Sequence, residues 1–555
     1  MEQIRLFLAI GLSILVFLIW DFFFIEKPNI NDLQQKNEKQ LQHKIDKSEP
    51  FIQETIIDSK NKIPISDEKY LQSGLTAKKI TVDTPLYRVK LSEKGGGFDS
   101  YLLKKYYETA ADDSPLKELI SYKLKKGTIV TEFADNSLPN LAEAVFKSNS
   151  NFEYVNVSDQ SQTISFVWTS PKGIVVEKIF FFSPDSYNIG LIIKIKNGSE
   201  TAFKDKLTLS LLNTIPVDNK MFGFIGPSSL IDNAVKQIEI NEKKEKNFYN
   251  GNIKWISIED GYFMSAIIPH KSIDASIRLF QYKDDIIENK LILPECIINS
   301  KTAQTFQFNL FLGPKKTDVL NTIGYDLNKV INYGWFDFIA KPCLWLMNII
   351  YTKIYSNYGF SIILLTILIK LVFWPLGTLS YKSMNEMKKI QPLMLEIREK
   401  HKNDKKKMNE EIMGLYKTYK VNPLGGCLPT VAQIPVFFAL YRMLYQAIEL
   451  RHAPFLWWIN DLSAPDRLFN FSFTIPFMEP PYGIPVLTII MGGTMLIQQK
   501  MSPPPGDPTQ AKMMMFLPIV FTFIFINFSS GLVLYWLVNN ILSIMQQYYI
   551  SKKTA

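Results

Sequence analysis

One charged side chain, Lys370, lies inside the apolar run SIILLTILIKLVFWPLG at residues 361–377. A lysine in the middle of a membrane helix costs about 2.5–3.5 kcal/mol on insertion scales, and such residues usually face a cavity or a partner. No aspartate or glutamate in the other apolar runs offers Lys370 a clear counter-charge. An unpaired cation at this depth indicates a wet cavity, whose natural visitor is a negatively charged segment of another molecule.

Polar side chains recur at similar depth in the other apolar runs, and glycine and proline interrupt those runs. Because polar groups are costly in hydrocarbon without partners, their recurrence indicates a polar lining around Lys370. The residues are Thr366, Gln433, Thr488, Thr494, Gln498, Gln499, Thr522, Asn527, Tyr535, Asn539, Gln546 and Gln547.

Other kinds of chemistry leave no comparable pattern in the sequence. The four histidines lie far apart, and no P-loop, zinc-finger spacing or HExxH motif occurs. Cys296, Cys343 and Cys427 fall one in each region, which fits small buried hydrophobes better than a disulfide framework. We therefore expect no catalytic residues, no metal and no cofactor. The net charge of +9 would fit nucleic acid, but its placement in particular loops argues for a membrane protein.

Membrane helices must position Lys370. The N-terminal apolar stretch is followed by large aromatics and charges rather than by a cleavage site, which predicts an uncleaved anchor helix over 6–25, in the segment 1–25. Five further apolar runs have bilayer length. They cover 359–377, 424–447, 483–499, 513–528 and 531–549, so the sequence predicts six spans.

Basic residues in the short loops predict the orientation of the spans. Residues 381–420 hold eleven Lys/Arg against six Asp/Glu, whereas residues 448–482 hold two against four. The basic loop is therefore expected in the cytoplasm, together with both termini. Lys370 then lies in the inner half of its span, and its cavity opens toward the cytoplasm.

The water-exposed part between the first two spans has two sections. Residues 26–65 are polar throughout and predict a flexible tether. Residues 66–320 contain many short alternating runs rich in Ile, Val, Phe and Tyr, which predict a large β-sandwich. EKGGGF at 93–98 is expected to form a strand turn, because no GK[ST] follows it. The carboxylates there mark no catalytic spacing, so a passive or partner-binding role is favoured over catalysis.

The basic loop itself is predicted to fold as a helical hairpin over 381–421. Two amphipathic stretches meet at HKND, and Asp404 can cap the second one. Met394 and Ile397 lie on the first apolar stripe, and Met408, Ile412, Leu415, Tyr416 and Tyr419 on the second. Lys388, Lys389, Lys405, Lys406 and Lys407 form either a solvated face or a surface that docks anionic lipid or ribosomal RNA.

Several stretches resemble the YidC/Oxa/Albino family of membrane protein insertases, and most closely its Gram-negative bacterial members. The most specific are VNPLGGCLP and SGLVLYW, supported by NYGFSIILLTILIKLVFWPLG, APFLWWINDLSAPD and QKMSPPPGDP. The resemblance implies a mixed fold: a polytopic α-helical membrane domain with a five-helix insertase core, a large periplasmic β-sandwich and a cytoplasmic hairpin. It also implies an amphipathic interfacial helix within 321–355, ahead of the core at 356–555.

The resemblance further implies a hydrophilic groove open to the cytoplasm and lipid. The groove residues by this likeness are Lys370, Thr366, Gln433, Phe437, Tyr535 and Trp536. The family usually has arginine where Lys370 stands, so the charge is kept but the bidentate fork is lost. The implied partners are nascent membrane proteins, the Sec translocon, the ribosome, the signal recognition particle receptor and the lipid bilayer, with no small-molecule substrate. The implied location is the bacterial inner membrane.

Two other classes of function deserve comparison. A secondary transporter or channel could use Lys370 as an ion site, but the sequence lacks paired half-repeats and intramembrane carboxylates. A membrane-anchored sugar-processing enzyme could use the β domain, but no catalytic constellation supports it. Insertion of membrane proteins without nucleotide or metal is therefore the expected activity.

Overall fold

The computed structural model describes residues 77–214, 223–238, 247–282, 285–422, 428–502 and 508–554. The predicted anchor at 1–25 and the tether at 26–65 lie outside these residues. The first part of the predicted 66–320 domain does as well.

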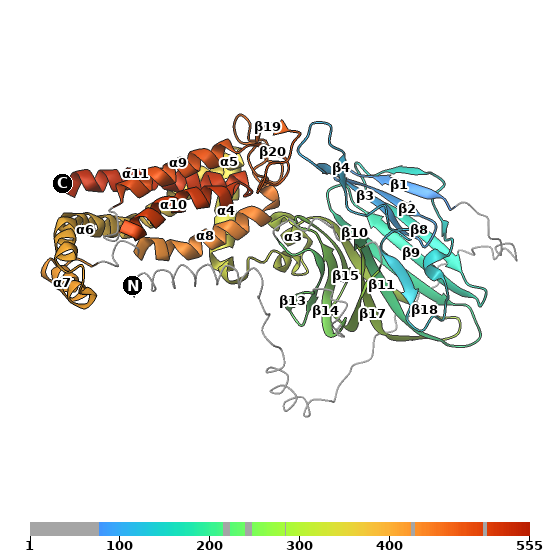
Figure 1. Ribbon diagram of the computed structural model, residues 1–555. Helices are drawn as coiled ribbons and strands as arrows, with labels where there is room; N and C mark the ends of the chain where they lie inside the picture. The colour runs from blue at the N-terminus through green and yellow to red at the C-terminus, as the bar shows by residue number, and fades with distance from the viewer. Residues whose placement is uncertain are drawn as a thin grey trace, which may run out of the picture. The chain divides into compact units, whose positions relative to one another are not determined.

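Two sheets form the β part of the chain, with strands largely where alternating apolar runs occur (Figure 1). The smaller sheet has the order β4-β3-β2-β1-β7, from β1 (Lys79–Asp83), β2 (Tyr87–Ser92), β3 (Gly97–Tyr107), β4 (Leu116–Glu118) and β7 (Tyr154–Asn156). Its β1–β7 pairing is parallel and its other pairings are antiparallel.

The larger sheet has the order β5-β11-β17-β16-β14-β15-β18-β10-β9-β8-β6, with β12 paired to β13 and β14. Its strands are β5 (Val130–Phe133), β6 (Lys147–Ser148), β8 (Gln162–Thr169), β9 (Ile174–Phe182), β10 (Asn188–Asn197), β11 (Phe203–Thr214), β12 (Gly226–Ile231), β13 (Ala234–Gln237), β14 (Phe248–Glu259), β15 (Phe263–Pro269), β16 (Ile273–Gln281), β17 (Ile286–Ile298) and β18 (Ala303–Pro314).

Side chains from the two sheets meet in one apolar core, which confirms the predicted β-sandwich. Buried and less buried residues alternate along β9, as expected where one face of a sheet is covered. The rings of Phe98 on β3 and Phe180 on β9 lie 5.4 Å apart and join the sheets. The expected domain end at 320 falls inside helix α3 (Thr317–Ile323), which begins soon after β18 ends.

The glycine run at 93–98 forms the turn from β2 into β3, as predicted. Gly95 has φ +73, and a Cβ there would lie 2.5 Å from the carbonyl oxygen of Ala142. The buried ammonium of Lys178 on β9 donates to the Gly95 carbonyl at 2.6 Å and lies 5.0 Å from the Phe146 ring centre. The turn is thus held by a lysine rather than shaped for a phosphate.

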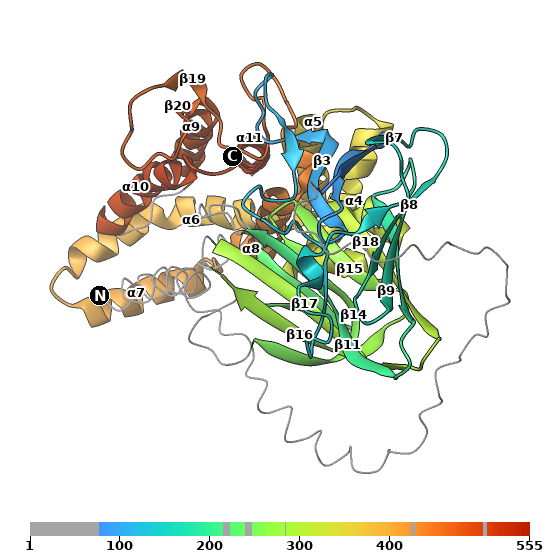
Figure 2. The ribbon, with the colours of Figure 1, turned by 90° about the vertical axis from the view of Figure 1, so that its right-hand side faces the viewer.

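From residue 317 onward the chain is mainly helical (Figure 2). Its helices after α3 are α4 (Asp337–Lys353), α5 (Tyr358–Val372), α6 (Trp374–Lys400), α7 (Lys405–Thr418), α8 (Leu428–Gln446), α9 (Val486–Met501), α10 (Pro508–Phe525) and α11 (Ser530–Thr554). Short 3-10 turns cover Leu141–Glu143, Leu327–Val330, Gly334–Phe336 and Ile448–Leu450, and β19 (Leu468–Phe471) pairs with β20 (Tyr482–Ile484). Helix α11 packs against α5, α6, α8 and α9.

The predicted span 359–377 is not one straight helix. Helix α5 ends at Val372, and α6 begins at Trp374 after a bend of 65°. Pro375, in the first turn of α6, has no N–H to donate, so it cannot continue the hydrogen-bond pattern of α5. Helix α6 then runs unbroken to Lys400, so the hairpin does not begin at 381 as expected.

A membrane span needs a helix that is both long enough and apolar enough to cross the bilayer. Among the described helices, none alone meets both requirements, whereas the bent pair α5 and α6 meets them together. The count of six spans therefore remains a prediction.

The hairpin of α6 and α7 has the predicted apolar seam. Ile390 and Met394 of α6 pack with Ile412 of α7. Asp404 caps α7 as expected, accepting hydrogen bonds from the backbone N–H of Lys406 at 3.1 Å and of Lys407 at 3.0 Å. Tyr419 was expected on this seam, but it follows the last turn of α7 and is 52% exposed.

Helix α4 lies in the region where the family resemblance implies an amphipathic helix. Ala340, Leu344, Met347 and Ile350 form its buried stripe, and the helix packs on α5 and α8. Trp345 and Phe338 remain exposed on the other side. Asp337 pairs with Lys341 at 2.8 Å in its first turn.

Candidate functional site: the surroundings of Lys370

Lys370 occupies the last turn of α5, a helix whose start is fixed by Asn357. The Asn357 side chain accepts a hydrogen bond from the Phe360 N–H at 3.0 Å. Lys370 is only 6% exposed, and its Nζ donates to Ser543 Oγ on α11 at 2.7 Å. Ser543 Oγ in turn donates to the Asn539 carbonyl at 2.7 Å. The ammonium is therefore enclosed by helices and held by a neutral hydroxyl.

In the part of the chain that the structure describes, no carboxylate forms an ion pair with Lys370. The sequence predicts a wet cavity around Lys370 that is open to the cytoplasm. In the structure the Lys370 side chain is buried instead, because α11 packs against α5 at this point.

The remaining predicted groove residues fall into separate surroundings. Thr366, one turn before Lys370, is buried and donates to the Ile362 carbonyl of its own helix at 2.6 Å. Phe437 on α8 meets Trp536 on α11 edge to face, with ring centres 4.8 Å apart. Tyr535 is buried in the helical core, and Gln433 on α8 is half-buried. Among the described contacts, Lys370 is joined to Ser543 rather than to these groove residues.

Two residues of α11 contribute more than the sequence pattern indicated. Nothing in the sequence distinguishes Ser543 from other serines, and Gln546 is one of many polar residues in the apolar runs. Gln546 Nε2 donates to the Trp374 carbonyl at 2.9 Å and to Thr378 Oγ1 at 3.3 Å, both at the start of α6, just after the bend that follows Lys370. Ser543 and Gln546 are three residues apart, which places both side chains on one face of a helix. This spacing is the sequence signal from which their shared role could have been predicted.

The predicted basic surface is carried by both arms of the hairpin. Lys388 and Lys389 of α6 are exposed, as are Lys406 and Lys407 of α7. Lys405 begins α7, and its side chain lies outside the described part. The five lysines thus belong to one helical hairpin with a small apolar seam.

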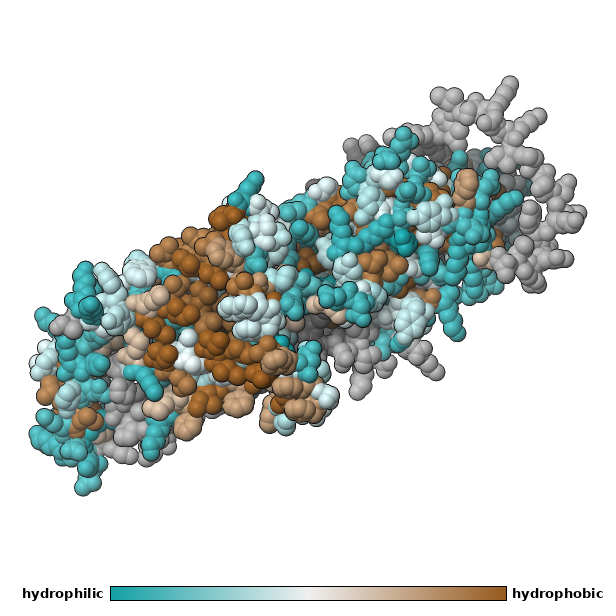
Figure 3. Space-filling model, turned by 90° about the horizontal axis from the view of Figure 1, so that it is seen from above, coloured by the Kyte–Doolittle hydropathy of each residue, from teal (hydrophilic) through white to brown (hydrophobic). Residues whose placement is uncertain are grey.

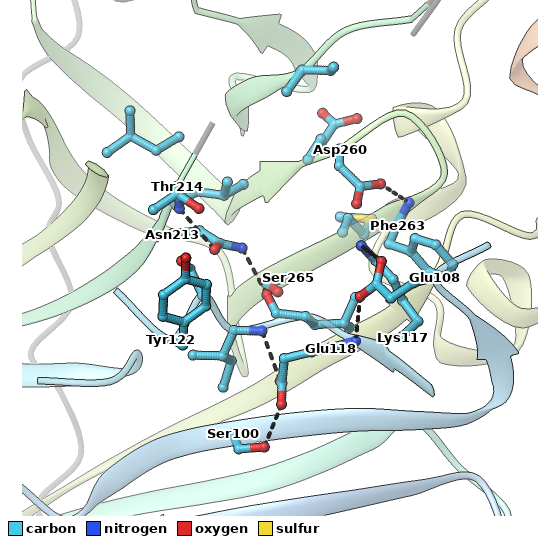
Figure 4. A pocket seen from close by; sticks show the side chains of 18 of the residues that line it. Ser100, Glu108, Lys117, Glu118, Tyr122, Asn213, Thr214, Asp260, Phe263 and Ser265 are labelled. Carbon is cyan, nitrogen blue, oxygen red and sulfur yellow. Dashed lines mark hydrogen bonds and ion pairs between the residues drawn. The ribbon is translucent and has the colours of Figure 1, made fainter. Parts of the chain in front are cut away.

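The β domain contains a cavity of about 340 Å³ with several carboxylates in its wall (Figure 4). Glu108 pairs with Lys117 at 3.1 Å, and Glu118 accepts the Tyr101 N–H at 2.6 Å. Asp260 accepts the Phe263 N–H at 2.6 Å in the turn before β15. These carboxylates thus stabilise the turns and strand ends that carry them. Among the described residues, no group of three or more His, Cys, Asp or Glu side chains could hold a metal ion.

Large apolar side chains are exposed along the outer faces of the helices. On the face shown in Figure 3, hydrophobic residues gather over the helical part of the chain. Helix α10 contributes Phe516, Val520 and Phe523, each more than half exposed. A continuous exposed apolar surface of this kind is typical of contact with lipid or another protein.

Comparison with known proteins covers nearly all of the described chain. Residues 349–555 match the family model described as 60Kd inner membrane protein, and residues 79–346 match the model of the YidC periplasmic domain. The membrane protein insertase YidC of Syntrophus aciditrophicus is 43% identical over 85% of each chain. That of Citrifermentans bemidjiense is 42% identical over 86% of each.

A solved structure described as an active YidC insertase with its first transmembrane domain resolved covers 86% of this chain and 93% of its own. It has 18% identity and a TM-score of 0.38, so membership of the family rests on the sequence matches. The family's role is membrane protein insertion, which is not an enzymatic activity, and its location is the bacterial inner membrane. By these sequence matches, which together cover nearly the whole described chain, the chain belongs to the YidC family of membrane protein insertases.

Proposed function

We propose that this protein takes nascent inner-membrane proteins from the cytoplasm into the bilayer through a hydrophilic groove beside α5. It does so alone or with the Sec translocon, and it assists their folding. The observation that carries this proposal is the buried Lys370 ammonium, whose described hydrogen bond goes to the neutral Ser543 hydroxyl. Two helices would need to separate slightly for a substrate segment to reach it.

The role of the charge follows from solvation. A buried cation with a neutral partner gains more from a carboxylate than from a hydroxyl, because the carboxylate carries the opposite charge and two opposite charges attract strongly where water is excluded. An acidic flank of the substrate is therefore held at Lys370 while its apolar helix moves along the exposed faces of α5 and α10 into lipid. This lowers the cost of bringing polar backbone and side chains to membrane depth.

The topology that fits this activity has six spans, with both termini in the cytoplasm and the β domain in the periplasm. The segments are the anchor at 1–25, the tether at 26–65, the β domain at 66–320, the interfacial region at 321–355 and the core at 356–555. The exposed lysines of the hairpin at 381–421 are then on the cytoplasmic side. There they would meet the ribosome, the signal recognition particle receptor or anionic lipid.

Site-specific crosslinking to a stalled nascent chain tests the groove. Photoreactive groups at positions 366, 370, 437 and 535 should crosslink to a membrane-protein nascent chain, whereas one at exposed Tyr122 of the β domain should not. Lys370→Ala should lower insertion of a single-span substrate with an acidic N-terminal tail. Equal insertion of that substrate by Lys370→Ala and wild type would show that the charge has no such role.

A further inference from the structure

Helix α11 presents two polar side chains, Ser543 and Gln546, to the segment around Lys370. Ser543 contacts Lys370 itself at the end of α5, and Gln546 contacts the first turn of α6. Both are buried, Gln546 completely and Ser543 to 3% exposure. Residues three apart on a helix lie on the same face, so one turn of α11 touches both sides of the bend at Phe373.

The hydrogen bonds of Ser543 have a defined direction. A serine hydroxyl has one proton, and here that proton goes to the Asn539 carbonyl. Ser543 Oγ therefore accepts the bond from Lys370 Nζ, and the lysine is the donor. This arrangement holds the ammonium at one place without neutralising it, which leaves the charge for a carboxylate.

Gln546 holds the bend that sets the direction of the same lysine. Its amide nitrogen donates to the Trp374 carbonyl and to Thr378 Oγ1. Gly377 allows this approach, because a Cβ there would lie 2.8 Å from Gln546 Oε1. Pro375 interrupts the helix, and side chains that contact α6 can also contribute to the angle between its two halves. The Gln546 side chain supplies contacts from a third helix that can fix it.

We propose that Ser543 and Gln546 are positioning residues for Lys370, Ser543 by direct contact and Gln546 through the α5–α6 bend. The inference rests on the proposed role of Lys370 in receiving an acidic flank. It extends that role by assigning the position of the charge to α11. A substrate carboxylate then accepts a hydrogen bond from another N–H of the ammonium, which has three, while the Ser543 hydroxyl stays in place; no covalent bond is made or broken.

The test uses the full-length protein and two single-span substrates that differ only in an acidic or a neutral N-terminal tail. Ser543→Ala should reduce insertion of the acidic-tail substrate about tenfold, the worth of a hydrogen bond to a charged group. The neutral-tail substrate should change less than about twofold, since removal of one hydroxyl leaves the helix packing in place. Ser543→Thr, which keeps the hydroxyl, should insert the acidic-tail substrate as well as wild type does. Gln546→Leu should show the same selective loss.

Asn540→Ala is the matched control, because Asn540 is buried on the same helix and donates to Thr494 Oγ1 on α9 at 3.2 Å, away from Lys370. It should affect both substrates equally. If Ser543→Ala also reduces both equally, or neither, the positioning role is wrong. The double variant Lys370→Ala/Ser543→Ala should be no worse than Lys370→Ala. A Lys370→Ala variant with full insertion would instead overturn the proposed function itself.

Discussion

Lys370 Nζ on α5 and Ser543 Oγ on α11 lie 2.7 Å apart, although 173 residues separate them in the chain. The hydroxyl offers a single acceptor atom, which suits the point charge of a lysine. Arginine, the residue expected at this position in the family, presents a planar fork with five donors instead. The contact therefore explains how a lysine can serve here: one acceptor holds it, and its charge remains available.

Two replacements of Lys370 distinguish the effect of its positive charge from the effect of its side-chain shape. Lys370→Arg should keep insertion of an acidic-tail substrate within about twofold of wild type, because the positive charge is retained. Lys370→Met, of similar length but uncharged, should reduce it about tenfold, the loss of a charge-assisted contact. Insertion in inverted membrane vesicles, measured by protection of the tail from protease, checks both. A loss with Lys370→Arg as large as with Lys370→Met would show that fork geometry or size matters more than charge.

Lys178 makes the stability of the β domain depend on pH. Its burial lowers the pKa of the ammonium from 10.5 to about 7. Between these values the unfolded chain binds a proton that the folded chain lacks, so the free energy of unfolding rises with pH. Guanidinium unfolding of the detergent-solubilised chain, followed by tryptophan fluorescence, should show wild type gaining stability relative to Lys178→Met from pH 7 to 10.5.

The control for that measurement is Lys196→Met, since Lys196 is exposed on β10 of the same sheet. The stability of this variant should run parallel to that of wild type over the whole pH range. Parallel curves for Lys178→Met and wild type would contradict the depressed pKa of the buried lysine.

Local patterns were sufficient for the elements but not for the contacts between them. Alternation identified the strands of the sandwich, and apolar runs located α8, α9, α10 and α11 to within a few residues. The break at Phe373 was missed because Phe373 and Trp374 continue the apolar run, which hides the effect of Pro375. The end of α7 before Tyr419 was missed for a similar reason. The spacing of apolar residues along a helix does not indicate where the helix ends.

The candidate site was likewise predicted only in part from the sequence. Lys370 was found because a charge in an apolar run is conspicuous within one segment. Ser543 was not, because a serine in a membrane helix is ordinary and its partner lies on another helix. How α11 is rotated about its axis relative to α5 decides that pair, and this rotation depends on packing that no single segment encodes.

Asp404 should control the order of the hairpin tip. Its carboxylate caps α7 through the N–H groups of Lys406 and Lys407. Asp404→Ala should destabilise the start of α7 by about 1 kcal/mol, whereas Asp404→Ser should retain most of the cap. Amide hydrogen exchange at Lys406 and Lys407 should accelerate several-fold in the alanine variant alone. Unchanged exchange there would mean that other contacts hold the end of α7.

Neighbouring glycines on α9 provide the sharpest test of helix packing. A Cβ at Gly492 would lie 2.2 Å from Thr522 Oγ1 on α10, whereas one at Gly493 would meet nothing within 4 Å. Gly492→Ala should therefore force α9 and α10 apart and cost about 1–3 kcal/mol, as overpacking does. Gly493→Ala should be neutral or slightly stabilising, because alanine favours helix. Thermal unfolding in detergent measures both, and Thr522→Ala should restore most of the stability of the Gly492→Ala variant, because it removes the two nearest atoms, Oγ1 and Cγ2. Equal melting temperatures for the two single variants would contradict this close approach of α9 and α10.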